Sequence, residues 1–181
     1  MRATLENGLL ASSPLPLKSY YLQSCFRYER AQKGRLREFH QFGIECFGTH
    51  HPSADVEAMA VADGLFRDLG VSRYITLEVN SIGCPNCRPA YHKALKEHFS
   101  AHKEQLCGTC LERLEKNPMR LLDCKEERCQ KIAADAPVGL DYLCEECTEH
   151  FDETKRLLEE VGINYRINPR IVRGLDYYTN T

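Results

Sequence analysis

The chain has 181 residues, of which 43% are hydrophobic and 28% are charged, enough for one ordinary domain with a hydrophobic core and a small insert. Lys and Arg number 24 and Asp and Glu 26, and the net charge of -2 excludes a uniformly basic coat for nucleic acid, though not a local basic patch. The sequence has no uncharged apolar run of about 18 residues and no signal-peptide pattern, so we expect no membrane span and a cytoplasmic location.

Two strands of an antiparallel hairpin are predicted at residues 18–30 and 38–48. The first segment is rich in Tyr, Phe and Cys, which favours a strand, and a basic loop with Gly34 as its turn residue joins it to the second. We expect Cys25 and Cys46 to be buried or half-buried packing residues of this hairpin.

The predicted hairpin gathers its hydrogen-bonding side chains mostly on one face of each strand. Alternation places Cys25, Arg27 and Glu29 together on the first strand. The matching row on the second strand is Phe39, Gln41, Gly43, Glu45 and Phe47. Because Gly43 has no side chain, we expect a gap there in which a ligand can approach the backbone.

Arginines beside these polar side chains indicate an anionic substrate that is held by charge-assisted hydrogen bonds. Arg27 and Arg35 are candidates to clamp phosphates, and Glu45 would face a cationic or hydrogen-bond-donating group. The alternative interpretation is a charged hairpin that is simply solvated and binds no ligand.

Helices and a strand are predicted after the hairpin. A helix with Ser53 as its N-cap should end at Gly70, and residues 73–81 have the composition of a strand. A helix followed by a strand is typical of an α/β or α+β domain. Pro89 is well placed to begin another helix, because the residues after it, 90–106, are charged and contain no Gly or Pro.

Cysteine is unusually frequent, with ten residues in a chain that has no tryptophan. Eight of them form four close pairs: Cys84/Cys87, Cys107/Cys110, Cys124/Cys129 and Cys144/Cys147. Without an export signal this density indicates metal binding rather than disulfides, and the spacings suit two structural zinc sites with four thiolates each. The alternatives are eight free cysteines that pack as small apolar side chains, and a redox role, for which no pair has a clear strand-to-helix context.

The expected helix at 90–106 bears on which pairs share a metal. At about 1.5 Å per residue it would hold the pairs at its two ends roughly 25 Å apart, which excludes a site made from those two pairs. A short helix from Leu111 and a strand over MRLLD would return the chain to the start of the long helix. We therefore expect one site with Cys84, Cys87, Cys124 and Cys129, and the other with Cys107, Cys110, Cys144 and Cys147.

After the last cysteine pair the sequence predicts a helix at residues 148–161 that Gly162 ends, and strands at 164–167 and 171–178. The last segment lies in NPRIVRGLDYYTNT, which is rich in polar and aromatic residues. Alternation places Arg173, Leu175 and Tyr177 on one face. The other face carries Gly174, Asp176 and Tyr178. The pattern alone does not indicate what this segment does.

Two motifs carry a resemblance to a known family. FRYERAQKGRLREFHQFGIECFG (26–48) closely resembles motif 2 of class II aminoacyl-tRNA synthetases in its histidyl form, and IVRGLDYYT (171–179) is similar to the histidine-specific motif of the same enzymes. NSIGCPNCR, NPMRLLDCK and the HF of TEHF resemble the stretch between them in cysteine-rich bacterial variants. The resemblance implies an α+β fold: a partial class II antiparallel sheet with flanking helices at 1–82 and 148–181, plus a helical, cysteine-rich, zinc-binding insertion at 83–147.

The resemblance implies roles for the residues that would face ATP. Arg27 would bind the α-phosphate, and Arg173 would approach the same phosphate from the opposite side. Arg35 would bind the outer phosphates, and Glu29 would lie near the adenine and the acceptor end of the tRNA. Mg2+ would bridge the phosphates, and catalysis would depend on positioning and on charge stabilisation at phosphorus, without a side-chain nucleophile.

The resemblance also implies which residues recognise histidine. Gln41 and Glu45 would contact the bound amino acid, with Glu45 reading the imidazole, and Tyr178 would hydrogen-bond the same ring. The implied reaction is activation of histidine by ATP to histidyl-adenylate, followed by transfer to the 3′ end of tRNA(His). At full length such an enzyme is a homodimer.

The chain departs from the family pattern in two respects. Ala31 stands where the family usually has proline, a change that the loop should tolerate. Motif 1 with its dimer interface, a loop with a further histidine-binding glutamate, motif 3 and the anticodon-binding domain are missing. We therefore expect an internal fragment of the catalytic domain that is inactive alone.

Two other functions fit parts of the sequence. A non-catalytic regulatory subunit of ATP phosphoribosyltransferase would keep the fold but lose the substrate residues. Those residues are all present, which disfavours it: Arg27, Gln41, Glu45, Arg173 and Tyr178. A stand-alone zinc-binding interaction module would have no need for the polar hairpin.

Overall fold

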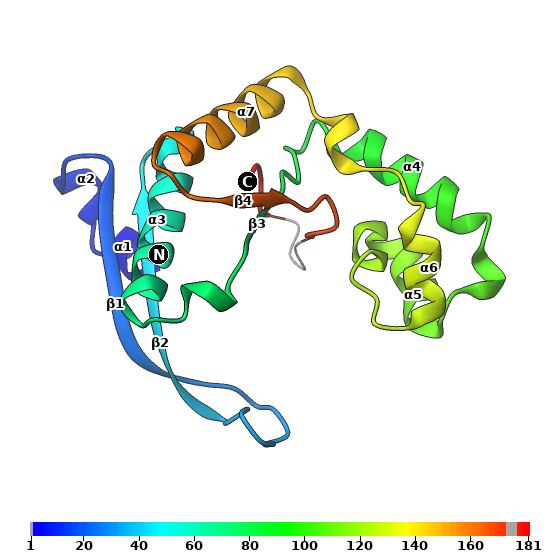
Figure 1. Cartoon of the computed structure of the whole chain (residues 1–181), viewed down its shortest axis with the longest axis horizontal. Helices are drawn as coiled ribbons and strands as arrows, with labels where there is room; N and C mark the ends of the chain where they lie inside the picture. Colours follow the sequence, from blue (N-terminus) through cyan, green and yellow to red (C-terminus); the bar gives the residue numbers. More distant parts are fainter. Residues whose placement is uncertain (1, 173–176) are drawn as a thin grey trace. The chain divides into compact units, whose positions relative to one another are not determined.

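The structure is a computed structural model that describes residues 2–172 and 177–181. It divides into two compact units, Met1–Ala54 and Asp55–Thr181, whose elements are labelled in Figure 1. The first unit contains α1 (Arg2–Glu6), α2 (Leu9–Ser12), β1 (Leu17–Phe26) and β2 (Glu38–Phe47). From the boundary onward follow α3 (Pro52–Asp68), β3 (Leu77–Val79), α4 (Arg88–Ser100), α5 (Gly108–Lys116), α6 (Glu127–Ala134), α7 (Glu145–Glu160) and β4 (Tyr165–Ile167). Short 3-10 helices lie at Ser72–Tyr74, Lys103–Gln105, Pro118–Leu121 and Gly139–Tyr142.

The antiparallel hairpin in the first unit is confirmed, although its first strand ends at Phe26 and not at residue 30, so Arg27 and Glu29 lie beyond it. Strand β1 pairs with β2 along its whole length, from Leu17 opposite Phe47 to Phe26 opposite Glu38. Beyond the strands the two arms close in a bridge between residues 32 and 35. Gly34 lies in this turn with a φ of 77°, a conformation that glycine adopts without the steric cost of a Cβ.

One core of the second unit lies where α3 and α7 pack against a parallel pair of strands. Strand β3 pairs with β4, with Leu77 opposite Tyr165. Phe151 and Leu158 recur at helical spacing on the buried face of α7 and join three other buried residues: Val56, Val79 and Ile163. The imidazole of His150 on α7 lies 3.5 Å from the Asp55 carboxylate, which adds a polar contact between the two helices.

The other core of the second unit is helical and encloses four of the cysteines. Helix α4 buries Tyr91, Leu95 and Phe99, which are spaced four residues apart and therefore share one face. They pack against α5, α6 and the Pro118–Leu121 turn, which lie near one another in Figure 1. Leu114 and Leu121 are the fully buried leucines that these elements contribute. All the secondary-structure elements assigned between residues 83 and 147 are helices. The fold is thus mixed α+β, with a small antiparallel sheet as expected and a parallel strand pair in addition.

Three expectations about local structure are wrong in detail. The strand expected at 73–81 is confined to β3, and the helix expected at 90–106 ends at Ser100. The stretch MRLLD is part of a 3-10 helix, not a strand, because Pro118 starts a tight turn in which the Arg120 N–H donates to the Asn117 carbonyl. Met119 and Leu121 are buried and Arg120 is exposed, an alternation that resembles a strand.

Other helix and strand ends follow the expectations only partly. Gly70 and Gly162 end α3 and α7 with φ values of 70° and 71°, as expected. At the start of α3 the cap is the His51 ring, whose Nδ1 accepts from the Ser53 N–H at 3.2 Å, so Ser53 is not the N-cap. The strand expected at 171–178 is not formed by its described residues, and residues 173–176 lie outside them. Among the described residues, no helix has the length and apolar character needed to cross a membrane.

The helical core should depend strongly on Leu95, whose side chain is fully buried. Leu95→Ala should lower the free energy of unfolding by about 2–5 kcal/mol, because it leaves a cavity where apolar contacts were made. Leu111→Ala on α5, where the side chain is 36% exposed, is the control and should cost less than half as much. Urea unfolding followed by circular dichroism measures both, and equal effects would contradict the assignment of Leu95 to this core.

Candidate metal centres and polar hairpin

Four cysteine sulfurs converge in a first cluster, formed by Cys84, Cys87, Cys144 and Cys147, and all lie within 4.8 Å of one another. The first pair occupies the turn that leads into α4, and the second pair spans the start of α7. The Cys144 N–H donates to the Cys87 sulfur at 3.0 Å, which joins the two turns. Gly83 precedes the first pair with a φ of 67°, and a Cβ there would lie 2.9 Å from Cys87 Cβ, so this position requires glycine.

A second cluster has the same composition and lies inside the helical core. Its members, Cys107, Cys110, Cys124 and Cys129, are all buried and their sulfurs also lie within 4.8 Å of one another. Cys107 directly precedes α5, and its backbone N–H donates to the Cys129 sulfur at 3.3 Å. Both clusters therefore combine a C-x2-C pair at a helix start with a backbone N–H that is aimed at a sulfur.

The pairing expected from chain reach is wrong, although the exclusion of the two nearest pairs is confirmed. The expected sets were Cys84, Cys87, Cys124 and Cys129, and Cys107, Cys110, Cys144 and Cys147; Cys124/Cys129 and Cys144/Cys147 exchange places. As a 3-10 helix the MRLLD stretch advances only about 2 Å per residue, too little to return along α4. The return is made later, where His98 hydrogen-bonds the Ile132 carbonyl at 3.0 Å and Tyr91 donates to the Pro137 carbonyl at 3.2 Å.

The two clusters have similar electrostatics. The Cys87 N–H holds the pKa of the Cys84 thiol down to about 7, and the Cys110 N–H does the same for Cys107, also to about 7. Burial raises the pKa of Cys110 and of Cys147. Each cluster therefore has one thiol whose pKa is lowered beside another whose pKa is raised. This combination suits a divalent metal, which binds thiolates and releases their protons.

The loop end of the hairpin holds the residues that were expected to meet ATP. The guanidinium of Arg27 lies 4.4 Å from the centre of the Phe39 ring, a cation–π contact. Arg35 lies 3.3 Å from the Glu29 carboxylate, and both side chains are exposed. Arg37 Nε donates to the Glu29 carbonyl at 3.1 Å, which fixes the backbone of the loop. Glu29 and Arg35 therefore lie together in this loop, whereas Arg27 is held against Phe39.

The half-buried face of the hairpin carries Gln41 and Glu45, but the gap expected at Gly43 is filled. The register places Tyr21 opposite Gly43, and a Cβ on that glycine would collide with the tyrosine ring. The Tyr21 hydroxyl accepts a hydrogen bond of 2.5 Å from Gln41 Nε2. Sequence reasoning missed Tyr21, although a large aromatic opposite a glycine is the cross-strand signal that indicates it. Cys46 is exposed rather than packed, because it lies on the other face.

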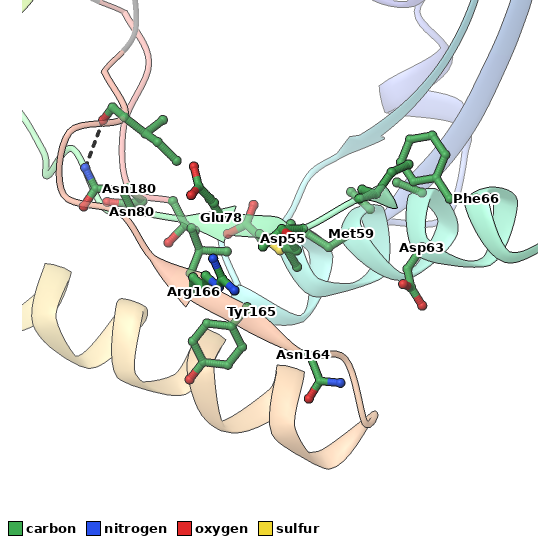
Figure 2. A pocket seen from close by; sticks show the side chains of 18 of the residues that line it. Asp55, Met59, Asp63, Phe66, Glu78, Asn80, Asn164, Tyr165, Arg166 and Asn180 are labelled. Atoms are coloured by element: carbon green, nitrogen blue, oxygen red, sulfur yellow. Dashed lines mark hydrogen bonds between the residues drawn. The ribbon is translucent and has the colours of Figure 1, made fainter. Parts of the chain in front are cut away.

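A groove of about 1200 Å³ lies in the second unit beside β3 and β4, and Tyr178 lines it. Figure 2 shows Glu78 and Arg166, which are register partners on the two strands, together with side chains of α3. Asn80 Nδ2 donates to the Ile171 carbonyl at 2.9 Å, the dashed line of Figure 2, and so holds the first residue of the last motif. Arg173 lies outside the described residues. Glu78 and Arg166 were not anticipated from the sequence.

Comparisons with known proteins agree on one family. The family "tRNA synthetase class II core domain (G, H, P, S and T)" matches residues 1–179. A histidine--tRNA ligase of Caldicellulosiruptor bescii is 53% identical over 180 residues, which are 99% of this chain and 42% of that protein. One of Clostridium perfringens is 50% identical over 182 residues, 100% of this chain and 43% of that protein. The crystal structure of apo S. aureus histidyl-tRNA synthetase superposes with a TM-score of 0.74 and 33% identity, over 98% of this chain and 40% of that one. The chain thus spans less than half the length of these relatives.

The cysteine partners can be tested with two matched double variants. Cys87→Ser with Cys147→Ser removes two ligands from the first cluster and none from the second, so about one tightly bound Zn2+ per chain should remain after dialysis against a chelator. Cys87→Ser with Cys129→Ser removes one ligand from each cluster, and less than about half an equivalent should remain. The reverse order of the two metal contents would support the pairing that we have rejected.

Proposed function

Since the chain belongs to the class II tRNA synthetase core family, we propose that it is part of the catalytic domain of a histidine–tRNA ligase. Such an enzyme activates histidine with ATP and transfers it to tRNA(His). The observation that carries the proposal is that relatives named histidine--tRNA ligase match it at 53% and 50% identity over 99% and 100% of its length. A regulatory subunit of ATP phosphoribosyltransferase is not favoured, because these relatives are ligases.

In the proposed reaction Arg27 and Arg35 hold the phosphates of ATP. The Phe39 ring supports the Arg27 guanidinium from one side, which leaves its N–H edge available for the α-phosphate. Arg35 is paired with Glu29 only through an exposed ion pair, which contributes about 0–1 kcal/mol, so a phosphate can replace the carboxylate at little cost. Glu29 is then released toward the adenine and the acceptor end of the tRNA.

The chemistry at phosphorus needs no side-chain nucleophile. The carboxylate of histidine attacks the α-phosphorus, and pyrophosphate leaves. Arg27 meets the charge that develops on the α-phosphate, and we assign Arg173, from the second motif, to the same phosphate on its opposite side. Mg2+ bound with ATP would neutralise charge on the outer phosphates. The chain's own contribution is therefore orientation and charge stabilisation.

Histidine selection is assigned to Glu45, Tyr178 and Gln41. A neutral imidazole has one nitrogen that donates and one that accepts, so a selective pocket needs an acceptor and a donor. Glu45 supplies a carboxylate acceptor and Tyr178 a hydroxyl donor. Gln41 is oriented by its 2.5 Å hydrogen bond to Tyr21, which supports a fixed contact with the bound amino acid.

We assign a zinc ion to each cysteine cluster and treat residues 83–147 as an insertion in a core formed by 1–82 and 148–181. Four sulfurs within 4.8 Å of one another suit the tetrahedral coordination of Zn2+, and four thiolates leave no open position for a substrate. Both ions would therefore be structural. The whole enzyme would act in the cytoplasm as a homodimer.

The proposed function is tested by ATP–pyrophosphate exchange with the full-length protein that contains this chain. Exchange should depend on histidine and respond to no other amino acid at equal concentration. Charging of tRNA(His) transcripts with labelled histidine measures the second step. Exchange that does not depend on an added amino acid would refute the proposal, as would equal stimulation by an amino acid other than histidine.

Glu45→Gln should weaken histidine binding selectively, because it keeps the size of the side chain but removes its charge. The Km for histidine in the exchange assay should rise by the equivalent of about 1–3 kcal/mol, the range for a hydrogen bond to a charged group, while the Km for ATP changes little. Glu38→Gln, at the start of the same strand and on its other face, is the control and should leave both constants unchanged. A raised Km for ATP with an unaltered Km for histidine would assign this carboxylate to the nucleotide instead.

A further inference from the structure

Asn180 is held between the first cysteine cluster and the loop that precedes it. Its backbone N–H donates to the Gly83 carbonyl at 3.2 Å, and its carbonyl accepts from the Ile82 N–H at 2.9 Å. Its side-chain Oδ1 lies 3.6 Å from the sulfur of Cys147. Asn180 also has a φ of 59°, in the left-handed region that asparagine tolerates better than most residues with a side chain. Three contacts and an uncommon backbone conformation thus meet at one residue.

The side-chain contact would have to change its direction if Cys147 held a metal. In a free thiol the Cys147 S–H donates to Oδ1 of Asn180. A metal-bound cysteine is a thiolate, which can only accept, so the amide must turn about its last bond and present Nδ2–H to the sulfur. Such donors orient a metal ligand and stabilise its charge. An amide can make this exchange, whereas a carboxylate of the same shape can only repel the thiolate.

The first cluster and Asn180 together enclose the loop at residues 81–84. Gly83 is hydrogen-bonded to Asn180 and directly precedes Cys84, which shares the cluster with Cys147. The loop has little freedom of its own, because Ser81 is 2% exposed and its hydroxyl accepts from the Gly83 N–H at 3.4 Å. An ion in the first cluster therefore fixes the loop through Cys84 and Asn180 through Cys147.

Tyr178 lies two residues before Asn180, within about 7 Å along even a fully extended chain. Both residues line the groove of Figure 2, in which Asn180 is labelled. Anchoring Asn180 therefore limits where Tyr178 can lie in this groove.

In the second cluster no sulfur makes a hydrogen bond to this segment among the described residues. The hydrogen bonds of its sulfurs stay within the cluster, between Cys107 and Cys124 and from the Cys107 N–H to Cys129. It therefore serves as an internal control with the same chemistry and a different position.

We propose that the metal site of the first cluster is a positioning device for Tyr178, with Asn180 as the positioning residue that connects them through Cys147. The assignment of Tyr178 to histidine rests on the proposed function, whereas the link from the metal to Asn180 does not. Loading of the first cluster then sets the affinity for histidine, while loading of the second stabilises only the helical core.

The central experiment compares Asn180→Asp with Asn164→Asp in the full-length protein. Asn164 also lines the groove, so its substitution adds the same charge there without touching a cysteine. With Co2+ in place of zinc, Asn180→Asp should shift the sulfur-to-cobalt charge-transfer bands and weaken metal retention at one site by about 10- to 100-fold, the range for loss of a partner of a metal ligand. Asn164→Asp should change neither. Unaltered bands and retention in Asn180→Asp would overturn the link.

The positioning of Tyr178 has two readouts of its own. In the exchange assay, Asn180→Asp and Cys147→Ser should each raise the Km for histidine by about tenfold or more with little change in the Km for ATP. Cys129→Ser should lower thermal stability without this effect. Chymotrypsin should cut after Tyr178 faster in Asn180→Asp than in Asn164→Asp, a measurement that needs no activity. Equal cutting rates, or an unchanged histidine Km with faster loss of metal, would leave the cluster purely structural and overturn the proposal.

A wild-type protein without histidine-dependent exchange would refute the proposed function alone, because the cobalt and proteolysis measurements would still decide the connection between the metal and the segment at 178–181.

Asn180→Ala provides the second variant if the aspartate prevents folding. It removes the donor without adding charge and should move the cobalt bands and the cutting rate in the same direction by a smaller amount. No change in either would overturn the proposal.

Discussion

Four cysteine sulfurs lie within 4.8 Å of one another in each cluster of the second unit, and as thiolates they would repel each other unless a cation lay between them. Each cluster takes two ligands from a turn at a helix start and two from a segment far along the chain. The ion of the first cluster would join segments that lie 60 residues apart in the sequence, at Cys84 and Cys144. A unit of the size of the 83–147 region is only marginally stable, and a bound metal would add to its stability.

The two clusters share a local plan but differ in their surroundings. The second is enclosed by the buried residues of α4, α5 and α6, so its ion would add to a core that already excludes water. The first lies where the chain enters and leaves the helical region, and Cys84 and Cys144 are only half-buried. Its position next to Asn180 is what connects a structural metal to a segment with a proposed role in histidine binding.

The hairpin in the first unit organises its polar residues by a different means, namely cross-strand pairing. Tyr21 fills the space over Gly43 and orients Gln41, and the Phe39 ring supports Arg27. These contacts fix side-chain directions before any ligand binds, and pre-orientation of this kind reduces the entropy that a ligand must overcome. The exposed pairing of the loop arginine leaves that residue free to exchange partners.

The sequence by itself determined the features that depend on local spacing: the hairpin and its polar face, the four cysteine pairs, and the helix ends at Gly70 and Gly162. At these helix ends glycine adopts a positive φ without the steric cost of a Cβ. Its long motifs also identified the family, because they consist of particular residues in a particular order and can be recognised without the fold. Tertiary structure alone decided which cysteine pairs come together in one cluster, since this depends on the path of residues 130–143 along α4. It also decided that Tyr21 closes the space over Gly43, because alternation along one strand says nothing about what the neighbouring strand places opposite.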